Sequence, residues 1–187
     1  FRGLNRFLPI LLLLVAPLFG QQPHKRVVLL MGSRFEITVV ADTPEQAGAW
    51  TDMAISEIRR IEKLISSWDP DSETSEINRN AGIKPVKISR ELYGLIDRSL
   101  RISELTDGAF DITYASMDRI WRFDGSMTAM PTPSEIAASV SRVGYRKIRL
   151  DPDALTVFLP EKGMKLGFGA IGKGYAADRA KELLMSR

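Results

Sequence analysis

Cysteine is absent from the 187 residues of this chain, and histidine occurs once, as His24. Without cysteine the chain can form no disulfide, hold no metal through thiolates and carry no lipid on sulfur. A marked excess of one charge is also missing, since residues 21–187 hold 24 basic and 23 acidic side chains. A nearly neutral domain gives no electrostatic reason to expect nucleic-acid binding. We assign His24 no role.

Long apolar runs are scarce, and the one that stands out is "FLPILLLLVAPLFG" at residues 7–20, preceded by Arg2 and Arg6. A short basic region followed by about 7–15 apolar residues is typical of a secretory signal peptide. The run is shorter than the roughly 20 residues that span a membrane comfortably. We therefore expect residues 1–20 to be a signal peptide and residues 21–187 to be exported, to the periplasm or the outer face of the cytoplasmic membrane. Membrane association through a retained anchor at 7–20 is the alternative.

The remainder of the chain begins with two strands and a long helix. Runs rich in β-branched residues predict strands at 25–30 and 34–41, separated by a turn at 31–33. Apolar residues at three- and four-residue steps predict a helix over 47–65, and Pro70 prevents it from continuing further.

Capping residues indicate two further helices. Ser89 is the expected N-cap of one, and Gly108, which tolerates positive φ, is its expected C-terminal residue. Thr132 opens the other with a capping box that Glu135 completes, and Gly144 is expected to stop it. The elements expected after it are strands at 146–151, 155–160 and 163–168 and a helix over 176–184. Because strands and helices do not alternate strictly, we expect an α+β fold with a mixed or antiparallel sheet and flanking helices.

The segment "GFGAIGKGYAAD", which starts at Gly167, matches two nucleotide-binding patterns poorly. Gly167, Gly169 and Gly172 fit G-x-G-x-x-G, but the acidic residue expected about 20 positions later is not in the sequence. Gly167, Gly172 and Lys173 fit a phosphate-binding loop, but Gly174 stands where serine or threonine should follow. Open backbone N–H groups at a helix N-terminus, with Lys173 beside them, still predict an anion site, most simply for phosphate. The alternative is that the glycines serve only a tight strand-to-helix turn.

Four segments occur along the chain in a recognisable order. They are "MGSRFEITV" at 31–39, "SSWDPDSETSEIN" at 66–78, "TDGAFDIT" at 106–113 and "GFGAIGKGYAAD" at 167–178. Together they resemble the ApbE family of FAD:protein FMN transferases, over residues 31–187. The resemblance implies a protein that binds FAD and magnesium and transfers FMN to a Ser or Thr hydroxyl of an acceptor protein, releasing AMP. An FAD pyrophosphatase, a non-catalytic flavin-binding protein and a P-loop or Rossmann nucleotide-binding module are the alternatives.

The resemblance also implies a set of site residues. Those expected to contact the cofactor are Met31, Trp68, Ala109, Phe110, Asp111, Gly167 and Lys173, and the carbonyl of Ala170 is expected to bind magnesium. Asp111 would be the polar contact, and Trp68 an aromatic partner for the flavin ring. Judged from the residues alone, Trp68 could instead anchor its loop on the first helix, Asp111 could cap a turn, and Met31 could be a plain core residue.

Two departures from the family pattern matter. The family often has aspartate where this chain has Gly167, so one polar contact to the cofactor would be lost or made by backbone. The family's remaining magnesium ligands, an aspartate and a threonine, and a histidine near the reaction have no counterpart in this sequence. We therefore expect the chain to be a fragment, incomplete at its C-terminus and inactive alone.

Overall fold

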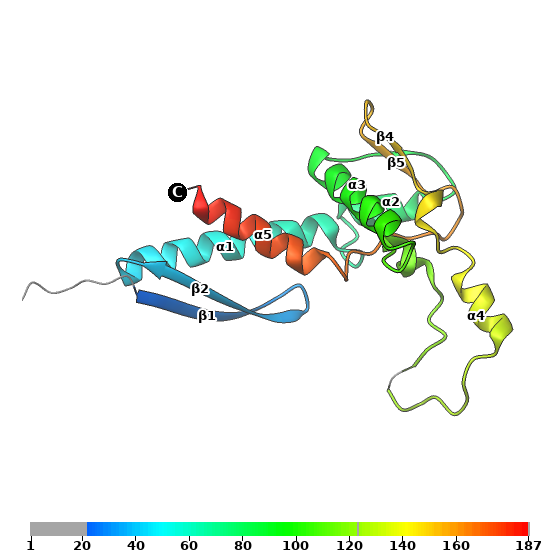
Figure 1. Cartoon of the computed structure of the whole chain (residues 1–187), viewed down its shortest axis with the longest axis horizontal. Coiled ribbons are helices and arrows are strands. Elements are labelled where there is room, and N and C mark those ends of the chain that lie inside the picture. Colours follow the sequence, from blue (N-terminus) through cyan, green and yellow to red (C-terminus); the bar gives the residue numbers. More distant parts are fainter. Residues whose placement is uncertain (1–21, 123, 187) are drawn as a thin grey trace, which may run out of the picture.

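The structure, a computed structural model, describes residues 22–122 and 124–186 of the chain. The expected signal peptide lies outside the described residues. Within them, no helix is long and apolar enough to cross a membrane. The molecule is elongated, with a hairpin and two long helices at one end and a small sheet with shorter helices at the other (Figure 1).

A β-hairpin forms one end of the molecule. β1 (Gln22–Leu30) pairs antiparallel with β2 (Ser33–Ala41), and the connecting Met31 and Gly32 both have positive φ, 51° and 65°. Two successive left-handed residues form the tight turn whose twist matches that of the flanking strands. Both strands expected in this part of the sequence are therefore confirmed.

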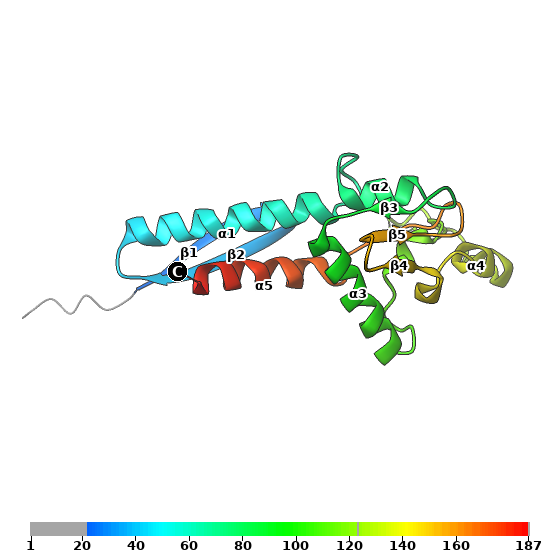
Figure 2. The same cartoon turned by 90° about the horizontal axis from the view of Figure 1, so that it is seen from above.

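Two long helices pack along this hairpin. α1 (Pro44–Ile65) and α5 (Gly172–Met185) lie side by side and run along the hairpin in both views (Figures 1 and 2). Val39 and Ala41 of β2 are buried against α1, and Leu184 of α5 packs onto the same cluster. The helix expected over 47–65 is thus confirmed, as is the expected helix that follows the glycine segment.

The other end of the molecule is built around a three-stranded antiparallel sheet of order β3-β5-β4. Its elements are β3 (Val86–Lys87), β4 (Arg149–Asp151) and β5 (Thr156–Phe158), with the helices α2 (Glu73–Arg79), α3 (Arg90–Leu105) and α4 (Pro133–Val140) and the 3-10 helices η1 (Ile112–Ser116) and η2 (Tyr145–Lys147). Ser89 caps α3 and Thr132 caps α4 with the expected capping box. Antiparallel sheets with flanking helices confirm the α+β class.

The strand expected at 163–168 is wrong. The backbone of Leu166 bonds to the side chain of Asn78, with its N–H 2.7 Å from Oδ1 and its carbonyl 3.1 Å from Nδ2. The backbone of Lys165 bonds in the same way to Ser116 Oγ, at 2.8 and 3.1 Å. These side chains take the place of a neighbouring strand. The backbone N–H and C=O groups of Lys165 and Leu166 therefore have hydrogen-bond partners although the segment joins no sheet.

The expected helix ends also need correction. α3 ends at Leu105, and Gly108, at a φ of 81°, donates its N–H to the Ser103 carbonyl across the end of the helix. α4 ends at Val140, four residues before Gly144. α2 and β3 were not predicted at all, because elements of seven and two residues offer too few positions for a periodic pattern to appear.

The main hydrophobic core lies where the two ends of the molecule meet. Its fully buried side chains include Ile61 of α1, Leu92 and Ile96 of α3, and Met164 and Leu166 of the extended segment. The loop after α1 and the segment after α3 both leave this core. Close packing of the core therefore helps to fix where each of them starts.

Candidate functional site

The glycine segment packs too closely against the rest of the protein for side chains at three of its four glycines. A methyl group at Gly167 would lie 2.9 Å from Ala115 Cβ, and one at Gly169 would lie 2.6 Å from Tyr114 Oη. At Gly172, the corresponding distance to Ile65 Cδ1 is 2.5 Å. Close packing against neighbouring side chains is therefore a reason for glycine at these three positions that the sequence did not indicate, and the predicted anion site stays a prediction.

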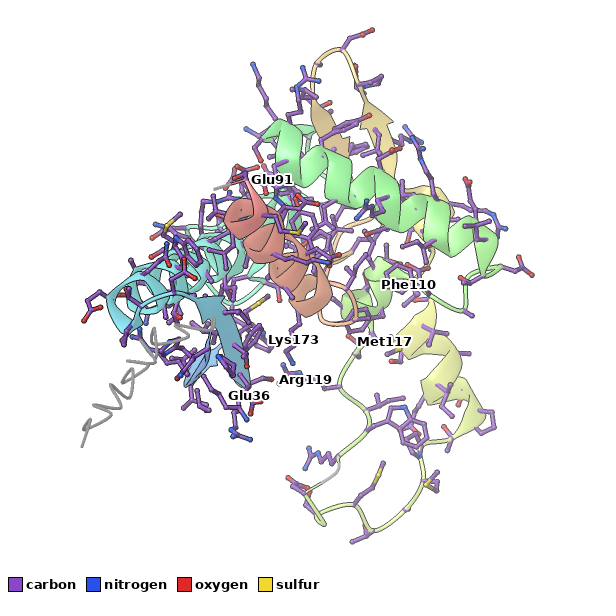
Figure 3. The ribbon with its side chains drawn as sticks, turned by 60° about the vertical axis from the view of Figure 1, so that its left-hand side comes forward. Glu36, Glu91, Phe110, Met117, Arg119 and Lys173 are labelled. Atoms are coloured by element: carbon purple, nitrogen blue, oxygen red, sulfur yellow. The ribbon has the colours of Figure 1, made fainter. Side chains whose placement is uncertain are left out.

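Gly174 differs from these three glycines. It lies in the exposed first turn of α5, and no described atom comes within 4 Å of the position that its Cβ would occupy. Lys173 beside it is exposed and projects from the start of the helix (Figure 3). Met31 Cε lies 3.5 Å from the Cβ position of Gly172, so the hairpin turn meets α5 at this point. Two of the predicted site residues, Met31 and Lys173, thus share the N-terminal end of α5.

Asp111 holds two turns together. Its Oδ1 accepts hydrogen bonds from the N–H and the hydroxyl of Thr113, at 2.7 and 2.6 Å, and so caps η1. Its Oδ2 accepts from the N–H of Tyr145 at 2.8 Å, at the start of η2. The capping role is therefore confirmed, while the flavin contact stays a prediction. Of its predicted neighbours, Ala109 is exposed and Phe110 is half-buried against the main core.

A groove of about 930 Å³ opens between the loop after α1 and the segment that follows η1. Its lining residues are Ser67, Trp68, Pro70, Ser75, Asn78, Arg79, Tyr114, Ala115, Met117, Asp118, Arg119, Trp121, Lys165 and Leu166. The lining combines three aromatic rings with three cations and one carboxylate. Rings and cations together suit an aromatic ligand that carries phosphate, and the volume lies in the upper range of ligand sites.

Trp68 lies in this groove. Its side chain is 78% exposed, so the alternative in which the ring anchors its loop on α1 is wrong. Ser66 Oγ fixes the loop by accepting hydrogen bonds from the N–H groups of Trp68 and Asp69, at 3.2 and 3.0 Å. The guanidinium carbon of Arg119 lies 5.0 Å from the centre of the Trp68 ring. A rigid loop thus presents an aromatic ring to solvent, which is the arrangement a stacking ligand requires.

The structure brings only some of the predicted site residues to the groove. Trp68 lines the groove, and Gly167 lies directly behind its wall, against Tyr114 and Ala115. The other predicted residues are not among the described residues that line the groove: Met31, Ala109, Phe110, Asp111, Ala170 and Lys173. Asp111 caps η1, whose Tyr114 and Ala115 line the groove, and Lys173 lies in the first turn of α5.

Apart from Trp68, the aromatic and basic residues of the groove were not predicted from the sequence: Tyr114, Arg119, Trp121, Lys165 and Arg79. The first three belong to one stretch, "YASMDRIW", which holds two aromatic residues and one arginine within eight positions. Aromatic rings close to a cation are a weak signal for a stacking surface, and this signal could have drawn attention to the stretch. Lys165 carries no comparable signal, because only the fold brings it to the groove.

The expected magnesium ligand is accessible but isolated. Ala170 is exposed, and its carbonyl accepts no hydrogen bond from the part of the chain that the structure describes. Across residues 22–122 and 124–186, no group of three or more His, Asp or Glu side chains is placed to hold a metal. Magnesium prefers about six oxygen ligands in octahedral geometry. The described residues therefore do not fit a complete magnesium site.

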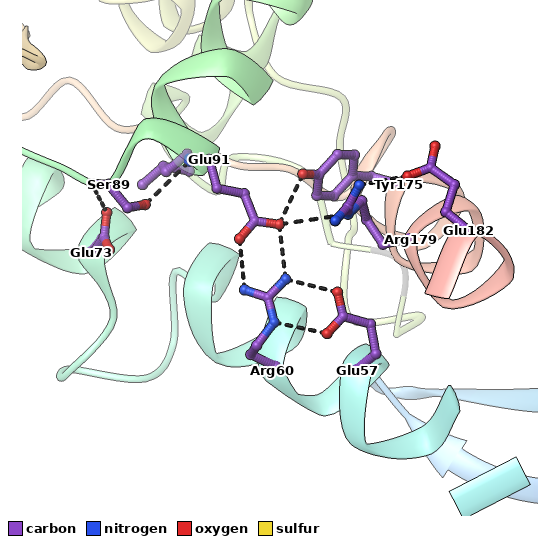
Figure 4. A network of polar contacts seen from close by, with 9 residues as sticks. Glu57, Arg60, Glu73, Ser89, Glu91, Tyr175, Arg179 and Glu182 are labelled. Carbon is purple, nitrogen blue, oxygen red and sulfur yellow. Dashed lines mark hydrogen bonds and ion pairs between the residues drawn. The ribbon is translucent and has the colours of Figure 1, made fainter. Parts of the chain in front are cut away.

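A polar network fixes the start of α5 to α1 and α3 (Figure 4). Glu91 accepts hydrogen bonds from Arg60 at 2.6 and 2.9 Å and from Tyr175 Oη at 3.0 Å, and Arg179 lies 3.9 Å away. The hydrogen bonds from Arg60 hold the pKa of Glu91 below its ordinary value. Burial, and after it the hydrogen bond to the Glu91 carboxylate, raise the pKa of Tyr175 to about 12. The network sets the position of Lys173, two residues before Tyr175.

The chain is similar to known proteins over most of its length. It is 28% identical over 167 residues to the FAD:protein FMN transferase of Treponema pallidum, covering 86% of this chain and 46% of that protein. It is 33% identical over 127 residues to an FAD:protein FMN transferase of Klebsiella pneumoniae, covering 68% of this chain and 40% of that protein. The chain thus spans less than half the length of these curated relatives.

Solved structures show the same fold. The ApbE protein of Thermotoga maritima superimposes with a TM-score of 0.78 at 28% identity, over 88% of this chain and 53% of that one. The flavin transferase ApbE of Vibrio cholerae matches with a TM-score of 0.77 at 19% identity, over 89% and 54%. A model of the ApbE family matches residues 31–187. With that match over most of its length, this chain belongs to the ApbE family.

Proposed function

We propose that the protein containing this chain transfers FMN from FAD to a Ser or Thr hydroxyl of an acceptor protein. In this reaction the acceptor oxygen bonds to the phosphorus of the FMN half, and the bond from that phosphorus to the bridging oxygen breaks. AMP leaves with the bridging oxygen, and the hydroxyl proton is released. The proposal covers the whole protein, because the chain spans about half the length of its relatives.

The observation that carries this proposal is the match to the ApbE family over residues 31–187, with the groove at Trp68 inside the matched region. The exposed Trp68 ring offers a stacking surface for the flavin, and the cations of the groove suit a pyrophosphate. Lys173 and the first turn of α5 offer a second positive region beside the groove. These features favour a dinucleotide over a neutral ligand.

Magnesium and the cellular location are also part of the proposal. Magnesium would supply charge neutralisation at the transferred phosphoryl group, with the Ala170 carbonyl as one ligand. Since the described residues do not complete a metal site, we assign no step of the reaction to the ion. We infer export to the periplasm from the signal-like pattern of residues 1–20, with the acceptor a protein that meets the enzyme there.

The test is to incubate the full-length protein with FAD, magnesium and a candidate acceptor protein. We expect a covalent mass gain of FMN on the acceptor and an equal amount of free AMP. An acceptor in which the target hydroxyl is replaced by alanine is the control. Free FMN without labelled acceptor would instead indicate an FAD pyrophosphatase. FAD that stays bound with no AMP released would indicate a non-catalytic flavin-binding protein.

A further inference from the structure

Arg119 and Lys165 are cations of the groove that no carboxylate neutralises within the described part of the chain. The third cation, Arg79, is paired with Glu76. The one acidic residue of the groove, Asp118, pairs with Arg142 at 2.7 Å and so is directed away from its neighbour Arg119. Two uncompensated positive charges therefore face the same space as the aromatic rings.

The backbone that carries each of these cations is held in place. The Asp118 carbonyl accepts a hydrogen bond from Ser139 Oγ at 3.1 Å, which ties the residue before Arg119 to α4. The backbone of Lys165 is bonded on both sides to Ser116 Oγ. Because the backbone is fixed at both positions, the Arg119 and Lys165 side chains can bind an anion without a rearrangement of the site.

Arg119 also covers one face of the Trp68 ring, at 5.0 Å, while most of the Trp68 side chain remains exposed. Figure 3 shows Arg119 on the segment between η1 and α4, near Met117. A guanidinium can contact a ring with its face and donate hydrogen bonds from its edge at the same time. Arg119 can therefore remain at Trp68 while its edge binds phosphate.

We infer that Arg119 and Lys165 bind the phosphate groups of the nucleotide whose flavin ring stacks at Trp68. This inference rests on the proposed function, because it takes a flavin nucleotide as the ligand. It adds two residues that none of the four family-like segments contains. It also separates their role from that of Trp68, since the cations recognise phosphate and the ring recognises flavin.

The experiment compares three flavins: riboflavin, which has no phosphate, FMN, which has one, and FAD, which has two phosphates and an adenosine. Their dissociation constants are measured by flavin fluorescence for the full-length wild-type protein and for Arg119→Gln, Lys165→Gln and Arg119→Lys. Arg122→Gln is the matched control, an exposed arginine three residues further along that does not line the groove. Circular dichroism checks that every variant folds.

We expect Arg119→Gln and Lys165→Gln each to weaken FMN and FAD binding by about tenfold or more, and riboflavin binding by less than about twofold. Arg119→Lys keeps the charge but loses the planar guanidinium, so it should weaken FMN and FAD binding less than Arg119→Gln does. Arg122→Gln should bind all three ligands like the wild type. Equal weakening for all three ligands would overturn the inference, because Arg119 would then only support the Trp68 ring. Unchanged binding of all three would also overturn it.

The outcomes separate this inference from the proposed function. A wild-type protein that binds FAD but labels no acceptor refutes the transferase, and the comparison of the three ligands still decides the role of the two cations. A wild-type protein that labels the acceptor, with Arg119 and Lys165 variants of unchanged affinity, refutes only the inference. A wild-type protein that binds none of the three ligands refutes both.

Discussion

Glu91 joins three helices that position the candidate site, and its replacement by glutamine tests that role. The carboxylate accepts two hydrogen bonds from Arg60 of α1 and one from Tyr175 of α5. Its side chain is 26% exposed, so the bonds are partly shielded from water. Glu91→Gln keeps the shape of the side chain and removes the charge.

The size of the effect follows from these three bonds. A hydrogen bond with a charged partner contributes about 1.5–3 kcal/mol to stability. The two bonds from Arg60 count for less than that, because Arg60 is about half exposed and keeps its bonds to Glu57. Glutamine also retains one acceptor oxygen. We therefore expect Glu91→Gln to lower the free energy of unfolding by about 2–3 kcal/mol at pH 7, and Tyr175→Phe to lower it by about 1 kcal/mol.

The assay is urea unfolding of the full-length protein, followed by circular dichroism, with Glu104→Gln as control. Glu104 is an exposed residue of the same helix, so its substitution should change stability by less than about 0.5 kcal/mol. A free energy of unfolding for Glu91→Gln within about 0.5 kcal/mol of the wild type would refute the reasoning. The network would then contribute nothing measurable to the free energy of unfolding.

The same substitution predicts a dependence on pH. Because Arg60 lowers the pKa of Glu91 in the folded state, the carboxylate stabilises the fold above its unfolded-state pKa, and this stability is lost as the pH falls through the folded-state pKa. The stability difference between wild type and Glu91→Gln should thus be constant above about pH 6 and shrink below about pH 4. Glu57, whose pKa Arg60 also lowers, titrates in both proteins. A difference that stays constant down to pH 3 would contradict the assignment to Glu91.

Three further predictions concern the residues around the groove. Lys173→Ala should weaken FAD binding by about tenfold or more in a fluorescence titration, because the start of α5 then keeps only its helix dipole. Asp111→Ala should lower the free energy of unfolding by about 2–4 kcal/mol in urea, because it frees two backbone N–H groups. Gly172→Ala should destabilise the protein, because the added methyl group would overlap Ile65. Gly174→Ala should fold normally and weaken FAD binding if phosphate approaches that turn closely. Unchanged FAD binding by Gly174→Ala would argue against an anion at the helix start.

Local sequence patterns predicted the parts of the fold that depend on local chemistry. The hairpin at Met31 and Gly32 and the long helix α1 followed from β-branched runs and from apolar residues at helical spacing. The caps Ser89 and Thr132 followed from side chains that accept a hydrogen bond within three residues. Such signals are contained in a few neighbouring residues, so a single sequence carries them in full.

Contacts between distant residues could not be predicted in this way. Residues 163–168 have the composition of a strand, yet Asn78, 88 positions before Leu166, takes the hydrogen bonds that a strand would give to its neighbour. The groove depends on the same contact, because it brings Lys165 beside the loop that carries Trp68. Resemblance to a family identified Trp68, but only the fold could bring Lys165 to it.

The glycine segment shows how a short pattern can identify a region and leave out one reason for its residues. Its spacing resembles two nucleotide-binding patterns, which require glycine where backbone approaches phosphate. In the structure, the requirement at Gly167 and Gly169 comes from Ala115 and Tyr114, whose segment continues into the wall of the groove. The glycines let α5 begin close behind that wall, which places Lys173 and the first turn of the helix near the ligand's space. Close packing and anion binding are therefore compatible explanations: the first positions the helix start, and the second would use it.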